Sequence, residues 1–445
     1  MVLDFCKIVE PNCVIGVISD VHAAGNDRFD FLPAAAAAGT LCRRALSVGC
    51  LTDQDSPSSP PKKKGISMKK TAFLSLLLSL TLLAGCAGGR QNSSGSGSGS
   101  SDIAQTPDGT RTVTDVWGRE VAVPETVTSI VCVGSGAPRI AAYLDVMDLV
   151  VGAEDHDIEA MTVLRDYSPV WQEHLAALPS IGAGGGSGAN NAYPEELIAL
   201  SPDVILAGFS AEAADELQGQ TGIPVVSVRY ISNGLADDTF YAAMRVFAEA
   251  VGAQDRCEEV LSYIDQCRAD LASRTADISE EDKPSAYTGA VTFSGRHGFT
   301  GTYSHFGPFD AVGAVNVADT DGEEGYYETD REQVLVWDPD YIFLDPGNMD
   351  LVNEEIAAFP DYFSSLRAAE EGRVYTMPSF NNCGMNISYA LVNAYWAGTV
   401  LFPEEFSDVN IQEKAGEILT FFLGENTFDV IEAGGLTYGT IDLGA

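Results

Sequence analysis

The sequence is poor in positive charge. Its 445 residues contain 25 lysines and arginines against 64 aspartates and glutamates, a formal net charge of −39. Beyond Cys86 only two lysines remain, Lys283 and Lys414, so arginine supplies nearly all the positive charge there. A chain this acidic repels phosphate backbones, which argues against a nucleic-acid partner. Because the acidic residues are spread along the sequence, we interpret most of them as a solvated surface, with steering of a cationic partner as the alternative.

Patterned cysteines are missing too. The nine cysteines form no Cys-x-x-Cys pair and no spacing typical of a zinc site. Cys257 and Cys267 fall on one predicted helix, which puts them about 15 Å apart, too far for a disulfide. The sequence therefore predicts no disulfide framework.

Local motifs of common enzymes are absent. The sequence contains no Gly-x-Ser-x-Gly and no His-Glu-x-x-His, and the glycine-rich stretch 182–188 lacks the Lys-Ser/Thr end of a phosphate-binding loop. We therefore expect no enzymatic activity, although a catalytic triad scattered along the chain carries no local motif. We interpret the glycine-rich stretch as a flexible rim that lets backbone approach a ligand.

An export signal begins at Met68. Two lysines follow it, and the apolar run 72–83 has the length of a signal-peptide core, too short to span a membrane. The run ends in Leu-Ala-Gly-Cys86, which resembles the lipobox of bacterial lipoproteins. The resemblance implies a signal peptide over 68–85 and a lipid-modified Cys86 that anchors the chain on the outer side of a membrane. A transmembrane anchor is the alternative.

Residues 1–67 precede this signal and need another explanation. They contain an alanine run and a Ser-Pro-Pro-Lys-Lys-Lys stretch, but no sustained periodicity. Since a signal sequence should begin a chain, we expect Met68 to be the initiator and residues 1–67 to be an over-extended gene start. An unstructured extension is the alternative.

The region after Cys86 is predicted to be a tether followed by two α/β lobes. Residues 86–111 include a Gly/Ser run that behaves as a flexible linker. Beyond it, β-rich runs alternate with helical stretches, which predicts parallel sheets covered by helices, in an N-terminal lobe (112–250) and a C-terminal lobe (281–445). The predicted strands are Ser129–Gly134, Val150–Ala153, Asp203–Gly208 and Pro224–Tyr230 in the first set, and Ser285–Phe293, Tyr341–Leu344 and Arg373–Met377 in the second.

A long helix is predicted between the two sets of strands, within residues 251–280. Val260, Ile264, Cys267 and Leu271 follow one another at helical spacing and form one apolar stripe. The stretch 254–276 would measure roughly 35 Å as a helix, enough to cross from one lobe to the other.

The order of several segments resembles one class of substrate-binding proteins of ABC transporters, class III, which carry ferric siderophores, haem or vitamin B12. The segments are 113–124, 133–140, 149–152, 195–205, 332–342 and 393–406, and the helix, Pro-Asp, strand unit occurs twice, at 195–205 and 332–342. The resemblance implies two Rossmann-like lobes with parallel sheets, joined by a single long α-helix, with the ligand cleft between them. It also implies a monomer without cofactor, which delivers its small-molecule ligand to a permease.

Two glutamates are implied as the permease-docking residues. In the family that the chain resembles, one glutamate on each lobe pairs with permease arginines, and the matching positions are Glu195 and Glu332. Carboxylate–guanidinium pairs are directional and charge-assisted, which suits such a joint. Both positions also fall at helix starts, where the helix dipole favours acids, so a purely structural role is the alternative.

The ligand is expected at loops that follow the strands. The loop 294–306 holds four candidate side chains within ten residues: arginine suits carboxylate or catecholate oxygens, and tyrosine or histidine can ligate iron. Arg139 is unfavourable near a helix start, which indicates either a ligand contact or a structural ion pair. The predicted ligand-binding residues are Arg139, Tyr193, Arg296, His297, Tyr303, His305 and Asn381.

Other functions remain open from the sequence. A bare metal-ion binder would need three or four converging His, Asp or Glu side chains, and His297 and His305 match no carboxylate motif. A lipid-anchored sensor or adhesin would use the same cleft without a transporter. The sequence does not distinguish a ferric siderophore from haem or cobalamin.

Overall fold

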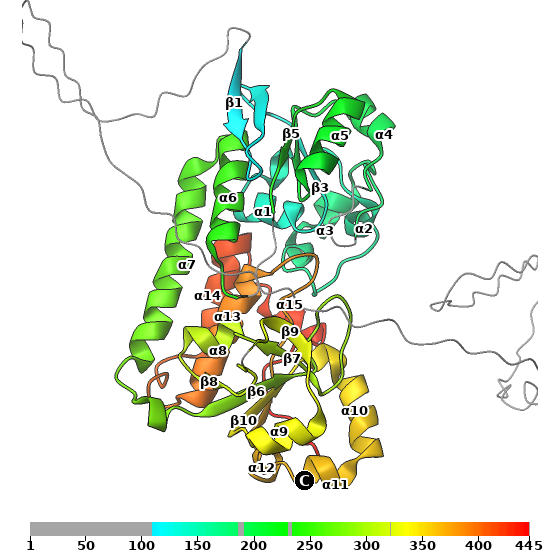
Figure 1. Ribbon diagram of the computed structural model, residues 1–445. Coiled ribbons are helices and arrows are strands. Elements are labelled where there is room, and N and C mark those ends of the chain that lie inside the picture. Colours follow the sequence, from blue (N-terminus) through cyan, green and yellow to red (C-terminus); the bar gives the residue numbers. More distant parts are fainter. Residues whose placement is uncertain (1–108, 186–190, 230–233, 321, 445) are drawn as a thin grey trace, which may run out of the picture. The chain divides into compact units, whose positions relative to one another are not determined.

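The computed structural model describes residues 109–185, 191–229, 234–320 and 322–444 (Figure 1). The chain divides into Met1–Gly95 and Ser96–Ala445, and all the described residues belong to the second unit. The predicted signal peptide, Cys86, the Gly/Ser tether and residues 1–67 lie outside the described residues. Within the described ranges, no helix combines the length and the apolar character needed to cross a membrane.

A β-hairpin opens the described chain. Strands β1 (Thr110–Thr114) and β2 (Glu120–Pro124) pair antiparallel. The turn is closed by the Asp115 carboxylate, which accepts the backbone N–H groups of Trp117 and Arg119, each at 3.0 Å. Gly118 takes the left-handed backbone that this turn requires, with φ 79°.

The N-terminal lobe contains a three-stranded parallel sheet in the order β3-β4-β5. Its strands are β3 (Ile130–Val133), β4 (Val204–Ala207) and β5 (Val225–Ser227), and its helices are α1 (Ala137–Tyr143), η1 (Met147–Leu149), α2 (Asp155–Ile158), α3 (Ser168–Ala176), α4 (Pro194–Leu200) and α5 (Ala211–Thr221). All residues of the three strands are buried, which is typical of a parallel sheet covered on both faces. The predicted strand Val150–Ala153 is wrong in extent, because only two isolated bridges form there.

The C-terminal lobe contains a four-stranded parallel sheet in the order β11-β10-β6-β8. Its strands are β6 (Ser285–Gly289), β8 (Val315–Asn316), β10 (Tyr341–Leu344) and β11 (Val374–Thr376), with the separate antiparallel pair β7 (Gly301–Ser304) and β9 (Gly325–Glu328). The helices are η2 (Glu280–Asp282), α8 (Gly307–Ala311), α9 (Arg331–Trp337), η3 (Pro346–Asn348), α10 (Met349–Ala358), α11 (Pro360–Ser364) and α12 (Arg367–Glu370). The predicted strand from Ser285 ends at Gly289, four residues early, because the chain turns there into a loop.

The repeated Pro-Asp unit has the same structural role in both lobes. Helices α4 and α9 each end in a left-handed residue, with φ of 51° and 45°, just before the proline. In the first lobe the Asp203 carboxylate accepts the Ser129 N–H at 3.0 Å, and Ser129 Oγ accepts the Asp203 N–H at 3.1 Å. Asp340 and Ser285 make the same reciprocal pair at 2.9 and 3.0 Å. The unit therefore fixes the start of the neighbouring parallel strand.

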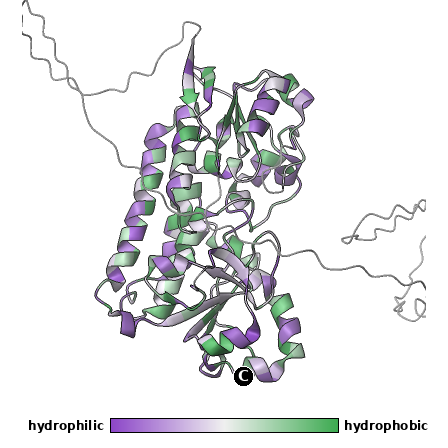
Figure 2. Ribbon diagram, in the orientation of Figure 1, coloured by the Kyte–Doolittle hydropathy of each residue, from purple (hydrophilic) through white to green (hydrophobic). Residues whose placement is uncertain are grey.

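Five further helices complete the molecule, α6 (Asp238–Val251), α7 (Gln254–Thr275), α13 (Ile387–Leu401), α14 (Ile411–Leu423) and α15 (Phe428–Ala433). The long helix predicted from the apolar stripe is α7, which is amphipathic (Figure 2) and packs against α6, α8 and α13. One hydrophobic core contains residues of α1, α6, α7, α13 and α14 together with one face of each parallel sheet. The opposite face of each sheet has a smaller core of its own. The predicted fold class, two α/β lobes with parallel sheets, is confirmed.

Candidate ligand-binding site

Loops at the carboxyl ends of both parallel sheets meet in this structure. In open parallel α/β sheets, ligands bind outside the carboxyl ends of the strands. The N-terminal lobe contributes the turn after β3 and helix α2, and the C-terminal lobe contributes the loops after β6 and β11. Side chains and backbone of 154–166 and of 381–388 are hydrogen-bonded to one another, so these two segments define the candidate site.

His156 and Cys383 form the contact that joins the two loops most directly. His156 Nε2 lies 3.2 Å from Cys383 Sγ, although the two residues are 227 positions apart. Burial lowers the pKa of His156, and the positive charge of Arg165 adds to this effect. Burial raises the pKa of the Cys383 thiol. Both groups are therefore held in the neutral form at neutral pH, a state in which the imidazole can accept a hydrogen bond or bind a metal.

Arg139 lies beneath this contact and is completely buried. Its Nε donates to Asp166 Oδ1 at 2.8 Å, and its two terminal nitrogens donate to the carbonyl oxygens of Asn382 and Cys383 at 2.9 and 2.8 Å. Ser388 Oγ donates to the other oxygen of Asp166 at 2.7 Å, and the Tyr143 hydroxyl donates to that oxygen too. Arg139 thus makes the structural ion pair that the sequence left as the alternative to a ligand contact.

Glu154 is a buried carboxyl at the same edge of the first sheet. It is 4% exposed, and its Oε2 accepts the Gly134 N–H at 3.2 Å. Burial raises the pKa of Glu154 to about 7, and the negative charges of Asp157 and Asp155 raise it further, while the Gly134 N–H opposes them. Gly184 covers this carboxyl with φ 67°, and a Cβ there would lie 2.7 Å from Glu154 Cβ, so only glycine fits. The carboxyl of Glu154 therefore changes its charge near neutral pH.

An aromatic cluster borders the loop after β6 in the C-terminal lobe. Phe293 stacks on Tyr326 with ring centroids 5.2 Å apart, and Tyr303 meets the edge of Phe293 at 5.9 Å. Phe306 continues the cluster to Phe380, 5.6 Å away, in the loop that carries Cys383. Phe293 and Tyr326 are half-buried, so part of this stack is accessible. We call these five side chains the aromatic cluster.

Tyr303 has an unusual position in the aromatic cluster. It is only 2% exposed, and its hydroxyl has no hydrogen-bond partner among the described residues. Burial raises its pKa well above the ordinary value of a phenol. A buried donor without a partner is costly, so this hydroxyl is a candidate partner for a ligand atom.

His297 and Arg296 make bonds within their own lobe. His297 Nε2 lies 2.9 Å from the Phe293 carbonyl oxygen, and its Nδ1 lies 2.7 Å from the Tyr326 hydroxyl. Arg296 donates to Asn348 Oδ1 at 2.8 Å and pairs with Asp350 at the start of α10. His297 thus supports the aromatic cluster, and Arg296 ties the loop to α10.

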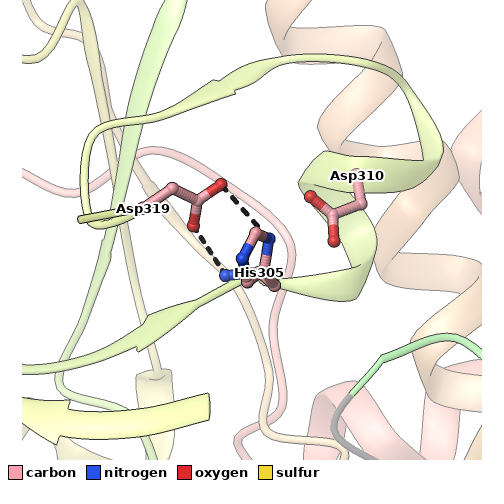
Figure 3. A group of neighbouring side chains, drawn as sticks. All are labelled: His305, Asp310 and Asp319. Atoms are coloured by element: carbon pink, nitrogen blue, oxygen red, sulfur yellow. Dashed lines mark hydrogen bonds and ion pairs between the residues drawn. The ribbon is translucent and has the colours of Figure 1, made fainter. Parts of the chain in front are cut away.

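The structure does not bring the seven predicted ligand residues into one site. The Tyr193 side chain is exposed before α4 and donates to Asp155 at 3.2 Å. Asn381 is half-buried in the small turn whose ends, Asn381 and Met385, pair as an isolated bridge. His305 lies instead beside Asp310 and Asp319 (Figure 3).

The two predicted docking glutamates are exposed at equivalent places. Glu195 lies in the first turn of α4 and Glu332 in the first turn of α9, the helices of the repeated Pro-Asp unit. Their exposure is compatible both with docking and with a role at the helix start.

Glu154, His156 and Cys383 of the site were not predicted individually, and neither was Arg229, which lies outside the two segments of the site. Arg229 is exposed at the carboxyl end of β5 and makes no hydrogen bond or ion pair with another described residue. None of the four belongs to a local motif. The position after a predicted strand was the only signal available for Glu154, His156 and Cys383, and such positions are numerous. Arg229 lies inside the predicted strand Pro224–Tyr230, where no signal marked it.

Comparisons with known proteins give a consistent result. The model of a family described as periplasmic binding protein matches residues 164–380. The molybdate-binding protein MolA of Haemophilus influenzae is 22% identical over 328 residues, which cover 69% of this chain and 89% of MolA.

Solved structures share the fold. A periplasmic solute-binding protein of Veillonella parvula aligns with a TM-score of 0.56 and 20% identity, covering 74% of this chain and 97% of its own. MolA with bound molybdate aligns with a TM-score of 0.53 and 21% identity, covering 71% and 98%. A TroA-like periplasmic binding protein, FepB of Veillonella parvula, aligns with a TM-score of 0.52 and 20% identity, covering 71% and 97%.

Proposed function

We propose that the chain, whose residues 164–380 match the periplasmic binding protein family, is an extracytoplasmic solute-binding component of an ABC importer that captures an iron complex or a corrinoid. The iron complex would be a ferric siderophore or haem. Cys86 would hold the protein at the membrane by its lipid, with residues 86–111 as the tether. Glu195 and Glu332 would seat the two lobes on the permease.

The aromatic cluster carries this proposal. Large chelates and macrocycles present wide flat surfaces, and aromatic side chains offer a matching contact area with little entropy to lose. The half-buried stack of Phe293 on Tyr326 lies at the carboxyl end of β6, the edge at which such folds bind ligands. The Tyr303 ring lies 5.9 Å from the Phe293 ring, and its hydroxyl has no hydrogen-bond partner among the described residues. A phenol oxygen is also a ligand that ferric iron accepts.

Two features of the opposing lobe fit an anionic metal complex. Arg229 supplies an exposed positive charge at the carboxyl end of β5, which suits carboxylate or catecholate groups. His156 supplies an imidazole with a lowered pKa, and Cys383 is the group a ligand would displace from it. The ligand would therefore separate two loops that contact each other in this structure.

Removal of the aromatic stack tests the proposal at the binding step. Phe293→Ala and Tyr326→Ala should each weaken the chelate at least tenfold, measured by titration calorimetry. Tyr263→Ala is the matched control, because Tyr263 stacks on Phe421 at 3.9 Å between α7 and α14, away from the site. Equal affinity in all three variants would remove the aromatic cluster from the proposal.

The docking assignment is tested by uptake. Exchange of Glu195 and Glu332 together for alanine should abolish ligand uptake by cells while leaving binding by the purified protein intact. The matched control exchanges Glu196 and Glu354, which are exposed on α4 and α10. Unchanged uptake, or loss of binding, would contradict the docking role.

A small oxyanion is the second candidate ligand. MolA of Haemophilus influenzae is a molybdate-binding protein, and Arg229 is an exposed cation that an oxyanion could use. Arg139 and Arg165 are less suitable, because each is buried in an ion pair, with Asp166 and Asp157 respectively. Arg229→Ala separates the two candidates, since it should abolish molybdate binding but only weaken the binding of a chelate held by the aromatic cluster.

A further inference from the structure

Three metal-ligating side chains converge in the C-terminal lobe at His305, Asp310 and Asp319 (Figure 3). His305 follows β7, Asp310 belongs to α8, and Asp319 follows β8. One nitrogen and two carboxylate oxygens from these residues all lie within 4.8 Å of one another. The cluster is therefore assembled by the fold from three segments rather than by one short stretch of sequence.

The Asp319 carboxylate is oriented by groups outside the cluster. Its Oδ1 accepts the Asn316 side-chain amide at 2.7 Å and the Ser304 hydroxyl at 3.4 Å, as well as the His305 backbone N–H at 2.6 Å. Its Oδ2 lies 3.7 Å from His305 Nδ1, too far for a hydrogen bond. One oxygen thus holds the side chain in place while the other stays available, as outer hydrogen bonds do for metal-binding carboxylates.

The other two side chains lack hydrogen bonds that would explain their convergence. Neither the His305 imidazole nor the Asp310 carboxylate is hydrogen-bonded to another described side chain or backbone group. All three residues are exposed, and the Asp310 and Asp319 carboxylates converge with the His305 ring. Two carboxylates brought together in this way repel each other, and a bound cation would remove the repulsion.

A hollow of about 510 Å³ adjoins the cluster and gives a cation access to it. Its lining includes His305, Thr320, Glu323 and Glu324, and it contains no lysine or arginine. Cations are attracted into a hollow lined with carboxylates, and water molecules there can complete a coordination shell.

We propose that His305, Asp310 and Asp319 bind one divalent first-row transition-metal ion, such as Mn²⁺ or Zn²⁺. One imidazole nitrogen with two carboxylate oxygens suits these ions, whereas Ca²⁺ and Mg²⁺ prefer oxygen alone. The ion would connect the end of β7, α8 and the segment after β8, and would so stabilise this part of the lobe. None of the three side chains belongs to the aromatic cluster, although His305 lies between Tyr303 and Phe306 in the chain.

Titration of the full chain with the metal alone tests this site. Calorimetry with Mn²⁺ and Zn²⁺ should show one equivalent bound at micromolar concentration, and His305→Ala and Asp310→Asn should each weaken it at least tenfold. Asp361→Asn, an exposed carboxylate on α11, is the control and should bind the metal normally.

Thermal unfolding provides a second readout that does not rely on heat of binding. Metal should raise the melting temperature of the native chain and of the control, but not of the two cluster variants, whose circular dichroism must show that they are folded. Absence of binding at millimolar metal would overturn the proposal. So would binding that survives both cluster substitutions, or binding of Ca²⁺ and Mg²⁺ alone.

Discussion

Removal of Arg139 should destabilise the protein more than removal of any exposed arginine. Its guanidinium is completely buried, pairs with Asp166 at 2.8 Å and donates to two backbone carbonyl oxygens of the loop that carries Cys383. Arg139→Met keeps most of the side-chain volume and removes all of these bonds. It leaves the Asp166 carboxylate buried with hydrogen bonds but without a positive partner.

The expected loss is large. Breaking a buried ion pair from one side costs about 3–5 kcal/mol, because the remaining charge stays desolvated. Asp166 keeps the hydrogen bonds from Tyr143 and Ser388, which places the loss near the lower end of that range. The two carbonyl oxygens of Asn382 and Cys383 lose their donor, and each such loss costs about 1 kcal/mol or more. Together these losses predict a decrease of about 5 kcal/mol in the free energy of unfolding.

Urea denaturation followed by circular dichroism measures this decrease. Arg245→Ala is the control, because Arg245 pairs with Glu258 on the surface. This variant should lower the free energy of unfolding by less than about 1 kcal/mol. Combining Arg139→Met with Asp166→Asn should recover part of the stability, since no charge then remains buried. A loss below about 1 kcal/mol for Arg139→Met, or no recovery in the double variant, would refute the reasoning.

Three further predictions concern the loops around the site. The folded pKa of Glu154, about 7, lies above its unfolded value of 4.5, so between these pH values the folded state binds one more proton than the unfolded state. The free energy of unfolding should therefore fall by about 3 kcal/mol as the pH rises from 4.5 through 7. Urea titrations at several pH values should show that Glu154→Gln removes this dependence and that Glu159→Gln keeps it. Gly184→Ala should destabilise the protein by more than the roughly 1 kcal/mol expected for Gly222→Ala. Both glycines have positive φ, but only Gly184 also has a close neighbour where a Cβ would lie. Equal urea midpoints for the two variants would contradict this prediction. The Cys383 thiol should react slowly with a maleimide in the ligand-free protein, because burial raises its pKa. His156→Ala should speed the reaction, because it removes the side chain that contacts the thiol. Mass spectrometry of the labelled peptide over time measures both rates, and equal rates would contradict this prediction.

Local patterns predicted the elements of the fold well. The apolar stripe of α7 predicted a helix over 254–276, and the structure has one over Gln254–Thr275. The two Pro-Asp units were recognised from their resemblance to the repeated unit of the family, and each aspartate forms the same reciprocal bonds to a serine at the start of the neighbouring strand. Periodicity suffices for a helix such as α7 because its residues are close in sequence, whereas the Pro-Asp bonds join residues 74 and 55 positions apart. The strand predicted over Val150–Ala153 was too long, because an apolar run does not show whether a partner strand lies beside it.

The site was predicted less well, because its contacts join distant residues. His156 and Cys383 are 227 positions apart, and no spacing in the sequence indicates their contact. Arg139 was correctly singled out as unusual at a helix start, but its partners in 382–383 could not be foreseen. His305 was noted without matching carboxylates, since Asp310 and Asp319 reach it through a helix turn and a strand connection rather than through a motif.

The central claim is that the junction of the two lobes captures a metal chelate or macrocycle. Titration of the purified protein with a ferric siderophore, haemin, cobalamin and molybdate, side by side in one calorimetric series, tests it most directly. We predict micromolar or tighter binding of at least one of the first three, at one ligand per chain and lost in Tyr326→Ala. Binding of molybdate alone, or of none of the four, would contradict the account.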